Sequence, residues 1–555
     1  MFRLAFNLQM RPFRIVSPNL PSRSCRLSSQ ATRAYRASPF RPPTQKRHHR
    51  QFPTRPTRQL KESALDPVSF LIAIGAGFTA AYIADSYYSS PPPEKASVPE
   101  TPAPPSSSET DADTDMAPTA LPGRPGSLTP DQEEKLRELW IATLDVFGVI
   151  SGGRQSLETT PAASTHAPAD TKKKSKLSMF SRKNKDADHS AENTDDENDK
   201  HGQAKEFRQA IQNQSPESLR TAFWGMVKHD DPDALLLRFL RARKWDVQAA
   251  LVMMISTLHW RSQEMHVDDD IVYKGEGGAV IDAKSASDAT AKKDAEDFLT
   301  QLRMGKSFLH GVDAEGRPVC VVRARLHRAG EQTEKSLERF TVYTIDTARM
   351  MLRPPIDTAT IIFDMTGFSM SNMDYTPVKF MIKCFEANYP ESLGSVLVYK
   401  APWVFQGIWK IIRGWLDPVV ASKINFCSNV EELSAFIPKS QISKELGGDE
   451  NYEYHYVEPR EGENDKMKDT ATRDRIEAER KELVHKYQTE TVHWAKGENK
   501  GENRAALRQD LLQNYWQLDP YVRARTLYDR IGVIGHAGKM DFYPTPVSTS
   551  SADLD

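Results

Sequence analysis

Cysteine is scarce in this chain. The 555 residues contain four cysteines, at positions 25, 320, 384 and 427, and no two of them are spaced as a C-x-x-C pair. A disulfide scaffold or a cysteine-based zinc site needs denser and more regular spacing. The sequence therefore predicts free, mostly buried thiols in a reducing compartment.

Sequence motifs for catalysis are also missing. The chain has no glycine-rich phosphate loop, no H-E-x-x-H helix and no G-x-S-x-G nucleophile elbow. His310 and Asp313 lie in the segment HGVDAEGRP, which reads as a turn leading into a strand. No pattern typical of nucleic-acid binding is present either. We therefore expect a protein that is not an enzyme, needs no cofactor or metal and binds no nucleic acid.

Acidic residues are absent from the first 61 positions, which carry fourteen Lys and Arg. This composition is typical of a mitochondrial transit peptide, and a simple basic arm is the alternative. Residues 68–84 then form an uncharged stretch of seventeen residues, close to the minimum of ~17 residues for a transmembrane helix. We expect a mitochondrial membrane anchor, with the globular part in the intermembrane space. For the segment 68–84, the alternative is a soluble or merely targeting segment. For the protein, the alternative location is cytoplasmic and peripheral on membranes.

Composition divides the rest of the chain. Residues 85–127 are rich in Pro, Ser and Thr and predict a disordered linker. An N-terminal helical lobe is expected over 128–265, where Thr129 and Pro130 mark a helix start. A charged insertion, 151–205, interrupts this lobe with a basic block followed by an acidic block. The insertion is expected to be disordered, and the alternative is that its basic block, 172–185, contacts anionic lipid under control of phosphorylation.

Strand and helix patterns alternate over 296–458, which predicts an α/β domain with a largely parallel sheet. Two breaks interrupt this region, one at Asp417-Pro418 and one at Gly447-Gly448. Gly447 and Gly448 are candidate hinges. Residues 466–536 predict a C-terminal helical extension, and 540–555 a loose tail. We expect the following strands and helices in the α/β region: strands 319–325, 358–364, 395–399 and 424–427, and helices 334–352 and 376–388, the latter capped by Thr376 with Pro377 at its first position.

The most informative stretch of the chain runs from Ala387 to Phe426. It contains a turn (NYPESLG), a continuous apolar strand (SVLVYKAP) and a helix over 404–416 that is apolar on more than one side. Such a helix covers an apolar surface, which is either ordinary core or the opening of a cavity. The apolar face of this helix is formed by Phe405, Ile408, Trp409, Ile412 and Trp415.

Several motifs, taken in order, make this chain resemble the CRAL-TRIO lipid-binding domain family, in its phosphatidylinositol transfer protein branch. The resemblance covers roughly residues 128–456 apart from the insertion. It rests on these segments: LLLRFLRARKW (235–245), HGVDAEGRPVCVVRAR (310–325), IIFDMTGFSM (361–370), YPESLG (389–394), VLVYKAPW (396–403), LDPVVASKI (416–424) and ELGGD (445–449).

The resemblance implies an apolar pocket for one lipid under a gate helix at 404–416. It also implies that the headgroup of phosphatidylinositol is bound by Glu391, Lys423, Arg243 and Lys244. Each of these four has a simpler alternative: Glu391 can be a turn residue, and Lys423, Arg243 and Lys244 can be solvated surface charges.

The chain also departs from this branch at three positions. Val420 stands where the branch has a threonine, three residues before Lys423. Ala359 and Ile361 replace two polar residues that bind choline headgroups in relatives that exchange phosphatidylcholine. We therefore expect phosphatidylinositol binding and transfer between membranes, with a second hydrophobic ligand compatible. A lipid-sensing scaffold that presents its lipid to a protein partner is the alternative function.

Overall fold

The computed structural model describes residues 121–150 and 199–544. In these two ranges, no helix combines the length and the apolar composition needed to span a bilayer. Five of the expectations fall wholly or mainly outside the described residues: the transit segment 1–61, the candidate anchor 68–84, the linker 85–127, most of the insertion 151–205 and most of the tail 540–555.

The N-terminal helical lobe begins at α2 (Pro130–Val146). As expected, Thr129 caps this helix, and its hydroxyl accepts a hydrogen bond from the backbone N–H of Gln132. The further helices of the lobe pack their apolar faces around Leu236, Phe239 and Met254. They are α4 (Gln203–Asn213), α5 (Pro216–Val227), α6 (Pro232–Ala242) and α7 (Val247–His259).

The predicted end of the insertion, residue 205, is wrong by a few residues. Helix α4 already begins at Gln203. The carboxylate of Asp199 accepts hydrogen bonds from the backbone N–H groups of Gln203 (2.6 Å) and Ala204 (2.9 Å). An acceptor placed there satisfies N–H groups that the first helical turn leaves free, so the helix extends into the charged segment.

Five strands form one sheet in the order β1-β2-β3-β4-β5. Strands β2 to β5 are parallel, as the alternating pattern predicts, and β1 is an antiparallel edge strand. The sequence analysis missed β1 because His310 and Gly311 interrupt its apolar run and read as part of a turn. The strand bounds are β1 Ser307–Val312, β2 Pro318–Arg323, β3 Ala359–Asp364, β4 Leu393–Tyr399 and β5 Ile424–Cys427.

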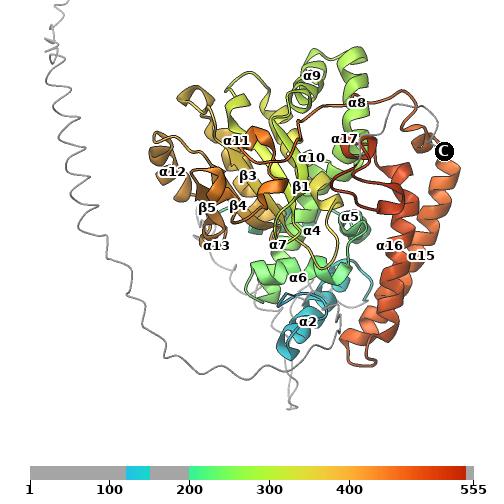
Figure 1. Ribbon diagram of the computed structural model, residues 1–555. Coiled ribbons are helices and arrows are strands. Elements are labelled where there is room, and N and C mark those ends of the chain that lie inside the picture. Colours follow the sequence, from blue (N-terminus) through green and yellow to red (C-terminus); the bar gives the residue numbers. More distant parts are fainter. Residues whose placement is uncertain (1–120, 151–198, 545–555) are drawn as a thin grey trace, which may run out of the picture. The chain divides into compact units, whose positions relative to one another are not determined.

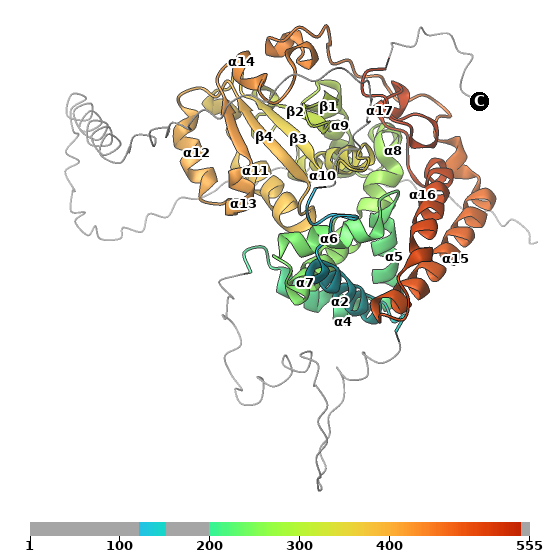
Figure 2. The ribbon, with the colours of Figure 1, turned by 60° about the horizontal axis from the view of Figure 1, so that its bottom comes forward.

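Helices cover the sheet, and helices precede strands β3, β4 and β5 along the chain (Figures 1 and 2). Helix α11 starts at Tyr375 and is capped by Asp374, so the prediction of Thr376 as its cap is wrong. Asp374 accepts from the backbone N–H of Thr376 (3.0 Å) and thereby starts the helix earlier. The bounds are α8 Val272–Ser285, α9 Ala289–Arg303, α10 Glu334–Met350, α11 Tyr375–Lys383, α12 Phe405–Arg413, α13 Pro418–Ser422 and α14 Val430–Leu433.

The register of the sheet gives it two distinct faces. Ile361 lies beside Val396, and Phe363 beside Val398, so these side chains form apolar rows on one face. The intervening residues Ile362 and Leu397 point to the other face, where they pack with a cluster that includes Leu433. The first face is the one that carries the candidate site.

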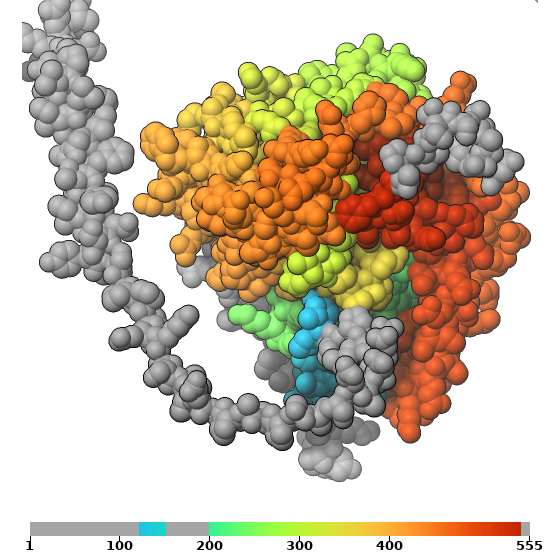
Figure 3. Space-filling view, viewed as in Figure 1, coloured from blue at the N-terminus to red at the C-terminus, as the bar shows by residue number. Residues whose placement is uncertain are grey.

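The C-terminal extension contains α15 (Thr470–Ala495), α16 (Glu502–Val522) and the short α17 (Leu527–Arg530). Helices α15 and α16 lie side by side along the helical lobe in both ribbon views. Tyr487 and Trp494 of α15 are part of the buried core of that lobe. In the space-filling view the C-terminal residues, orange to red, form a continuous surface from the α/β region to this helix pair (Figure 3).

Candidate lipid-binding site

A cavity of about 230 Å³ lies between the apolar sheet face and the helices that cover it. Its walls come from the strands of the sheet and mainly from helices α10, α11 and α12, and they are almost entirely hydrocarbon. The apolar lining residues include Ile361, Phe363, Val396, Val398 and Ile424 of the sheet, Leu337 and Phe340 of α10, Met381 and Ile382 of α11, and Phe405, Trp409 and Ile412 of α12. Such a cavity suits an apolar chain, because hydrocarbon removed from water is stabilised by ~0.8 kcal/mol per CH₂.

Helix α12 is the element that the sequence analysis interpreted as a gate. Phe405, Trp409 and Ile412 line the cavity, as expected. Ile408 is buried against neighbouring apolar residues but is not among the lining residues. Trp415 does not line the cavity either, and its ring packs edge-on against Tyr375 at 5.2 Å between ring centres.

The outer side of α12 and its neighbours exposes apolar side chains. Trp403, directly before α12, is 82% exposed, and Ile411 on the helix is 48% exposed. Val419 of α13 and Phe426 of β5 are exposed to a similar degree. The exposed cations Lys400, Lys410 and Arg413 lie in the same segments. Exposed tryptophan and aliphatic side chains next to cations are typical of a surface that binds a membrane interface.

Glu391 and Lys423, two of the four predicted headgroup residues, lie together. The Lys423 ammonium is 3.8 Å from a carboxylate oxygen of Glu391, and both side chains are about one-fifth exposed. Glu391 has a positive φ of 53°, and its backbone carbonyl accepts a hydrogen bond from Arg238 (2.7 Å). The pair is therefore accessible, and the Arg238 contact fixes the turn that presents it.

Arg243 and Lys244 lie at the C-terminal end of α6. The Arg243 guanidinium hydrogen-bonds the side chain of Gln203; burial lowers the pKa of Arg243, and the carboxylates of Asp417 and Asp199 partly offset this. Asp417 caps α13, the short helix that Lys423 directly follows. Arg243 therefore lies toward the segment that leads to Lys423. Lys244 is exposed, and within the described ranges it forms no hydrogen bond or ion pair with the other three predicted residues.

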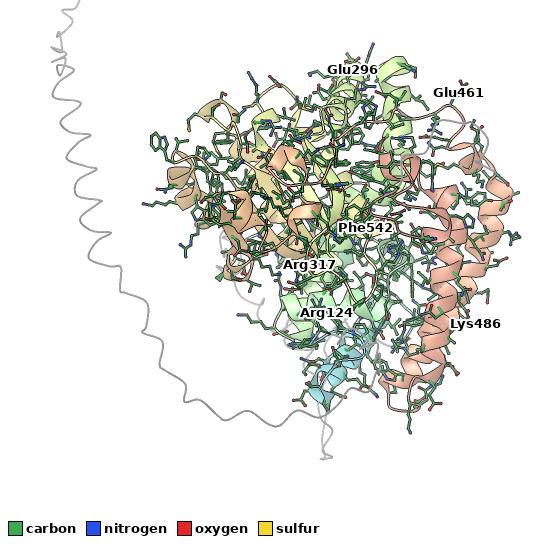
Figure 4. All side chains as sticks on the ribbon, in the orientation of Figure 1. Arg124, Glu296, Arg317, Glu461, Lys486 and Phe542 are labelled. Atoms are coloured by element: carbon green, nitrogen blue, oxygen red, sulfur yellow. The ribbon has the colours of Figure 1, made fainter. Side chains whose placement is uncertain are left out.

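Arginines also surround the turn that carries Glu391. Arg124 (Figure 4) and Arg241 both form ion pairs with Asp357, at 2.9 and 3.1 Å. Arg238 donates only to backbone carbonyl groups, those of Glu391 and Asp357. Three cations face the two carboxylates of Asp357 and Glu391, so this side of the site carries an excess of positive charge. That excess is suited to an anionic headgroup.

The structure describes all three residues at which this chain differs from the resembled branch. Ile361 and Val420 both line the cavity, while Ala359 lies at the start of β3. None of these side chains can hydrogen-bond a headgroup. The positions at which polar residues would bind choline are therefore apolar in this chain.

The candidate hinge glycines lie away from α12. Gly447 has a positive φ of 94°, and a Cβ on Gly448 would lie 2.0 Å from the backbone oxygen of Ile442. The backbone N–H of Gly448 donates to the carbonyl of Ser443 (3.1 Å). These glycines form a tight turn packed on the face of the sheet opposite to the cavity.

Sequence reasoning missed the polar residues at one end of the cavity. Gln301, Lys306, His327, Asn372 and Asp374 are among the lining residues. Lys306 is 6% exposed, which is unusual for a lysine. Nothing in the segment RMGKSF marks this lysine as buried, because its burial depends on α9, β1 and the loop before α10 meeting in three dimensions.

Comparisons with known proteins agree with this geometry. The family model of the CRAL/TRIO domain matches residues 302–448, and that of the CRAL/TRIO N-terminal domain matches residues 203–256. A CRAL-TRIO domain-containing protein of Schizosaccharomyces pombe is 43% identical over 74% of this chain and 92% of its own length. The phosphatidylinositol transfer protein CSR1 of Eremothecium gossypii is 37% identical over 76% of this chain and 100% of its own.

Proposed function

The chain belongs to the CRAL-TRIO family, and from this premise we propose that it binds one phosphatidylinositol molecule and exchanges it between membranes. The observation that carries the proposal is the apolar cavity closed by α12, next to the accessible pair Glu391 and Lys423. The relative named a phosphatidylinositol transfer protein supports the choice of lipid.

The chemistry of an inositol phospholipid has two parts that match two parts of this site. The acyl chains are stabilised in the cavity by removal from water. The headgroup phosphate is anionic, and burying it without a cation costs several kcal/mol. Lys423 and the arginines around the Glu391 turn supply cations, and the Glu391 carboxylate can accept hydrogen bonds from inositol hydroxyls. The step is binding and release of an intact lipid, so it needs no catalytic group.

Membrane contact is the second part of the proposal. The exposed residues Trp403, Ile411, Val419 and Phe426 enter the interface, and the nearby cations contact anionic headgroups. Because Phe405, Trp409 and Ile412 of the same helix line the cavity, movement of α12 at the membrane opens the path for the lipid. The tight turn at Gly447 and Gly448 remains a candidate hinge for this movement.

Phosphatidylinositol is favoured over phosphatidylcholine in this proposal. A choline headgroup deep in the cavity needs polar partners, and the chain has Ala359 and Ile361 at the corresponding positions. Unpartnered polar groups in an apolar cavity are unfavourable by about 1–3 kcal/mol each. Phosphatidylcholine transfer is therefore expected to be much slower than phosphatidylinositol transfer.

The test is a transfer assay with the full chain, labelled phosphatidylinositol in donor vesicles and unlabelled acceptor vesicles. Lys423→Ala is expected to reduce the transfer rate about tenfold, the effect of losing one charged hydrogen bond. Lys439→Ala, which removes an exposed lysine elsewhere, is the matched control and leaves the rate unchanged. Unchanged transfer by a folded Lys423→Ala protein rejects the proposed headgroup site.

The alternative function, a scaffold that presents a bound lipid to a protein partner, was suggested by the long C-terminal helices. In the structure, Tyr487 and Trp494 of these helices pack into the helical lobe. The helices thus have a role within the protein itself, and we favour the carrier. Tight lipid binding without transfer in the assay above is the result that selects the scaffold.

A mitochondrial membrane location also stays part of the proposal. It rests on the composition of residues 1–61 and 68–84 alone, and contact of the basic block 172–185 with anionic lipid rests on composition in the same way. If the anchor is present, it confines the transfer domain to one membrane, so exchange takes place between that membrane and those within reach of the linker 85–127.

A further inference from the structure

The cavity has a polar end that the binding of phosphatidylinositol does not use. Lys306 lies just before β1, and α12 packs near β5, so the sheet order places Lys306 toward the edge opposite to the gate helix. The backbone of Lys306 is held between α9 and β2: its N–H donates to Gln301 (3.0 Å) and its carbonyl accepts from Arg323 (2.9 Å). The backbone at this end of the cavity is therefore held in place by hydrogen bonds.

The Lys306 ammonium is buried, and no carboxylate among the described residues forms an ion pair with it. It donates to the amide oxygens of Gln332 (2.8 Å) and Gln301 (3.5 Å), both neutral and buried. An ammonium has three N–H groups, and the described residues provide acceptors for two of them. Burial lowers the pKa of Lys306 to about 8, although carboxylates farther away oppose the shift. At neutral pH the group is mostly charged, and it faces a cavity made of hydrocarbon.

The other polar groups near Lys306 are already paired. Asp374 contacts the His327 ring (3.2 Å), and Asp297 pairs with Lys293 (2.9 Å). The side-chain N–H groups of Asn372 donate to the carbonyls of Arg325 (3.0 Å) and His327 (2.9 Å). The site therefore offers one buried ammonium with an N–H group that has no acceptor among the described residues, and few further free donors.

We propose that Lys306 binds the carboxylate of a long-chain fatty acid, whose hydrocarbon tail occupies the apolar cavity toward α12. This inference rests on the proposed lipid-binding function and names a second ligand class for the same cavity. A carboxylate can accept a hydrogen bond from the third N–H group of the Lys306 ammonium and brings a negative charge to it. The carboxylate is the end of the fatty-acid molecule and carries no further hydroxyl or sugar group. It therefore needs no hydrogen-bond donors beyond those present. An inositol headgroup has many hydroxyls that this end of the cavity leaves without partners.

The first experiment compares two ligands of equal chain length on the unaltered full-length protein, freed of lipid. Oleate carries the carboxylate, and oleyl alcohol lacks the charge. We expect oleate to bind at least about tenfold more tightly, since a hydrogen bond between charged groups contributes that much. Equal affinities for the two ligands overturn the proposal, and this comparison does not depend on the folding of any variant.

The second experiment uses Lys306→Met, which removes the charge and keeps the length of the side chain. We expect the preference for oleate over oleyl alcohol to disappear, while Lys306→Arg retains it. Lys335→Met is the matched control, because this lysine of α10 is 79% exposed. A folded Lys306→Met protein that still prefers oleate overturns the proposal.

Measuring phosphatidylinositol binding from vesicles for the unaltered protein and for Lys306→Met distinguishes a failure of this inference from a failure of the proposed function. Retained phosphatidylinositol binding with lost oleate preference in Lys306→Met supports the fatty-acid site. A native protein that binds phosphatidylinositol but shows no oleate preference rejects only the fatty-acid site. A protein that binds neither ligand rejects both proposals.

A pH series gives an independent readout. The titratable groups around Lys306 are Asp297, His327, Glu331 and Asp374. Burial lowers the pKa of His327 below its ordinary value and that of Lys306 to about 8, so Lys306 is the group expected to titrate in this range. Oleate affinity is expected to fall as the pH rises from 7.5 to 9.5, and oleyl alcohol affinity to stay constant. A pH-independent preference for oleate contradicts the role of Lys306.

Discussion

Tyr389 shows how one residue of the NYPESLG turn supports the whole site. Its ring is buried, and its hydroxyl donates to Asp346 of α10 at 2.5 Å. Asp346 also accepts two hydrogen bonds from Arg261, each 3.2 Å long. Burial opposes ionisation of Asp346, but Arg261, Lys228 and Arg349 outweigh it and hold the pKa of Asp346 well below its usual range. This buried network joins the turn that carries Glu391 to the helical lobe.

Asp346→Asn is expected to destabilise the protein by about 3 kcal/mol at pH 7, because it leaves the buried Arg261 short of its partner. The pKa of Asp346 is lower in the folded than in the unfolded protein. Its stabilising contribution is therefore complete above pH ~4, the unfolded value, and is lost as the pH falls further. Urea unfolding at pH 7, 5 and 3 measures the difference between wild type and variant, which is expected to shrink at pH 3.

Asp269→Asn is the control for this prediction. The Asp269 side chain is 67% exposed, and its carboxylate pairs with the exposed side chain of His266. We expect a change in stability below about 0.5 kcal/mol at each pH, as is usual for surface pairs. An Asp346→Asn effect as small as this control contradicts the assigned network.

At the scale of the element, α12 has two functions on its two sides. Its inner side closes the cavity with Phe405, Trp409 and Ile412, and its outer side and flanks expose Trp403 and Ile411. A helix that is apolar only on its inner side would be an ordinary amphipathic cover. The apolar outer side makes this element suited to leave the sheet for a membrane interface.

Trp403→Ala is expected to weaken binding to anionic vesicles about tenfold, because an indole side chain gains ~1.5–3 kcal/mol on full transfer from water and part of this at an interface. The exposed side chain makes few contacts within the protein, so the unfolding temperature is expected to stay the same. Vesicle sedimentation measures the affinity. Tyr273→Ala, at an exposed aromatic residue of α8, is the control. If both variants bind vesicles equally, the α12 surface is not the docking surface.

At the scale of the whole molecule, the C-terminal helices complete the helical lobe. Asp233 of α6 accepts hydrogen bonds from Trp140 (2.7 Å) and from Tyr487 (3.1 Å). Arg504 of α16 also forms a buried ion pair with Asp233. Asp233 and Arg504, which are 271 positions apart, thus share one buried network. Lys486 lies on the exposed side of α15 (Figure 4). The lobe depends on α15 and α16 for its core.

Deletion of residues 470–555 is expected to abolish cooperative folding, because it uncovers Trp140 and Trp224 and leaves Asp233 without its arginine. Thermal unfolding and solubility measure the effect. The control is a chain that ends at residue 544 and keeps all three C-terminal helices. A shortened protein that unfolds cooperatively within about 5 °C of the full chain contradicts this interdependence.

The elements that sequence reasoning placed well are those whose signals are local. Strands β2 to β5 are short apolar runs between turn residues, and Thr129 is a helix cap whose bond spans three residues. The errors have local causes as well. Asp374 caps α11 in place of Thr376, and Asp199 starts α4 inside a charged segment. In α11 two neighbouring side chains could accept from the same free N–H groups, and sequence alone does not rank such competitors.

The sequence by itself determined the alternating α/β pattern, the apolar helix after the fourth strand and, through its motifs, the family. These follow from periodicity and from the order of residue types along the chain. Only the tertiary structure decided that Glu391 and Lys423 meet, that Tyr487 and Trp494 belong to the helical lobe, and that Lys306 is a buried cation at the end of the cavity. The reason is physical: charge pairing and burial depend on distances between segments far apart in the chain, which no local pattern of residues specifies.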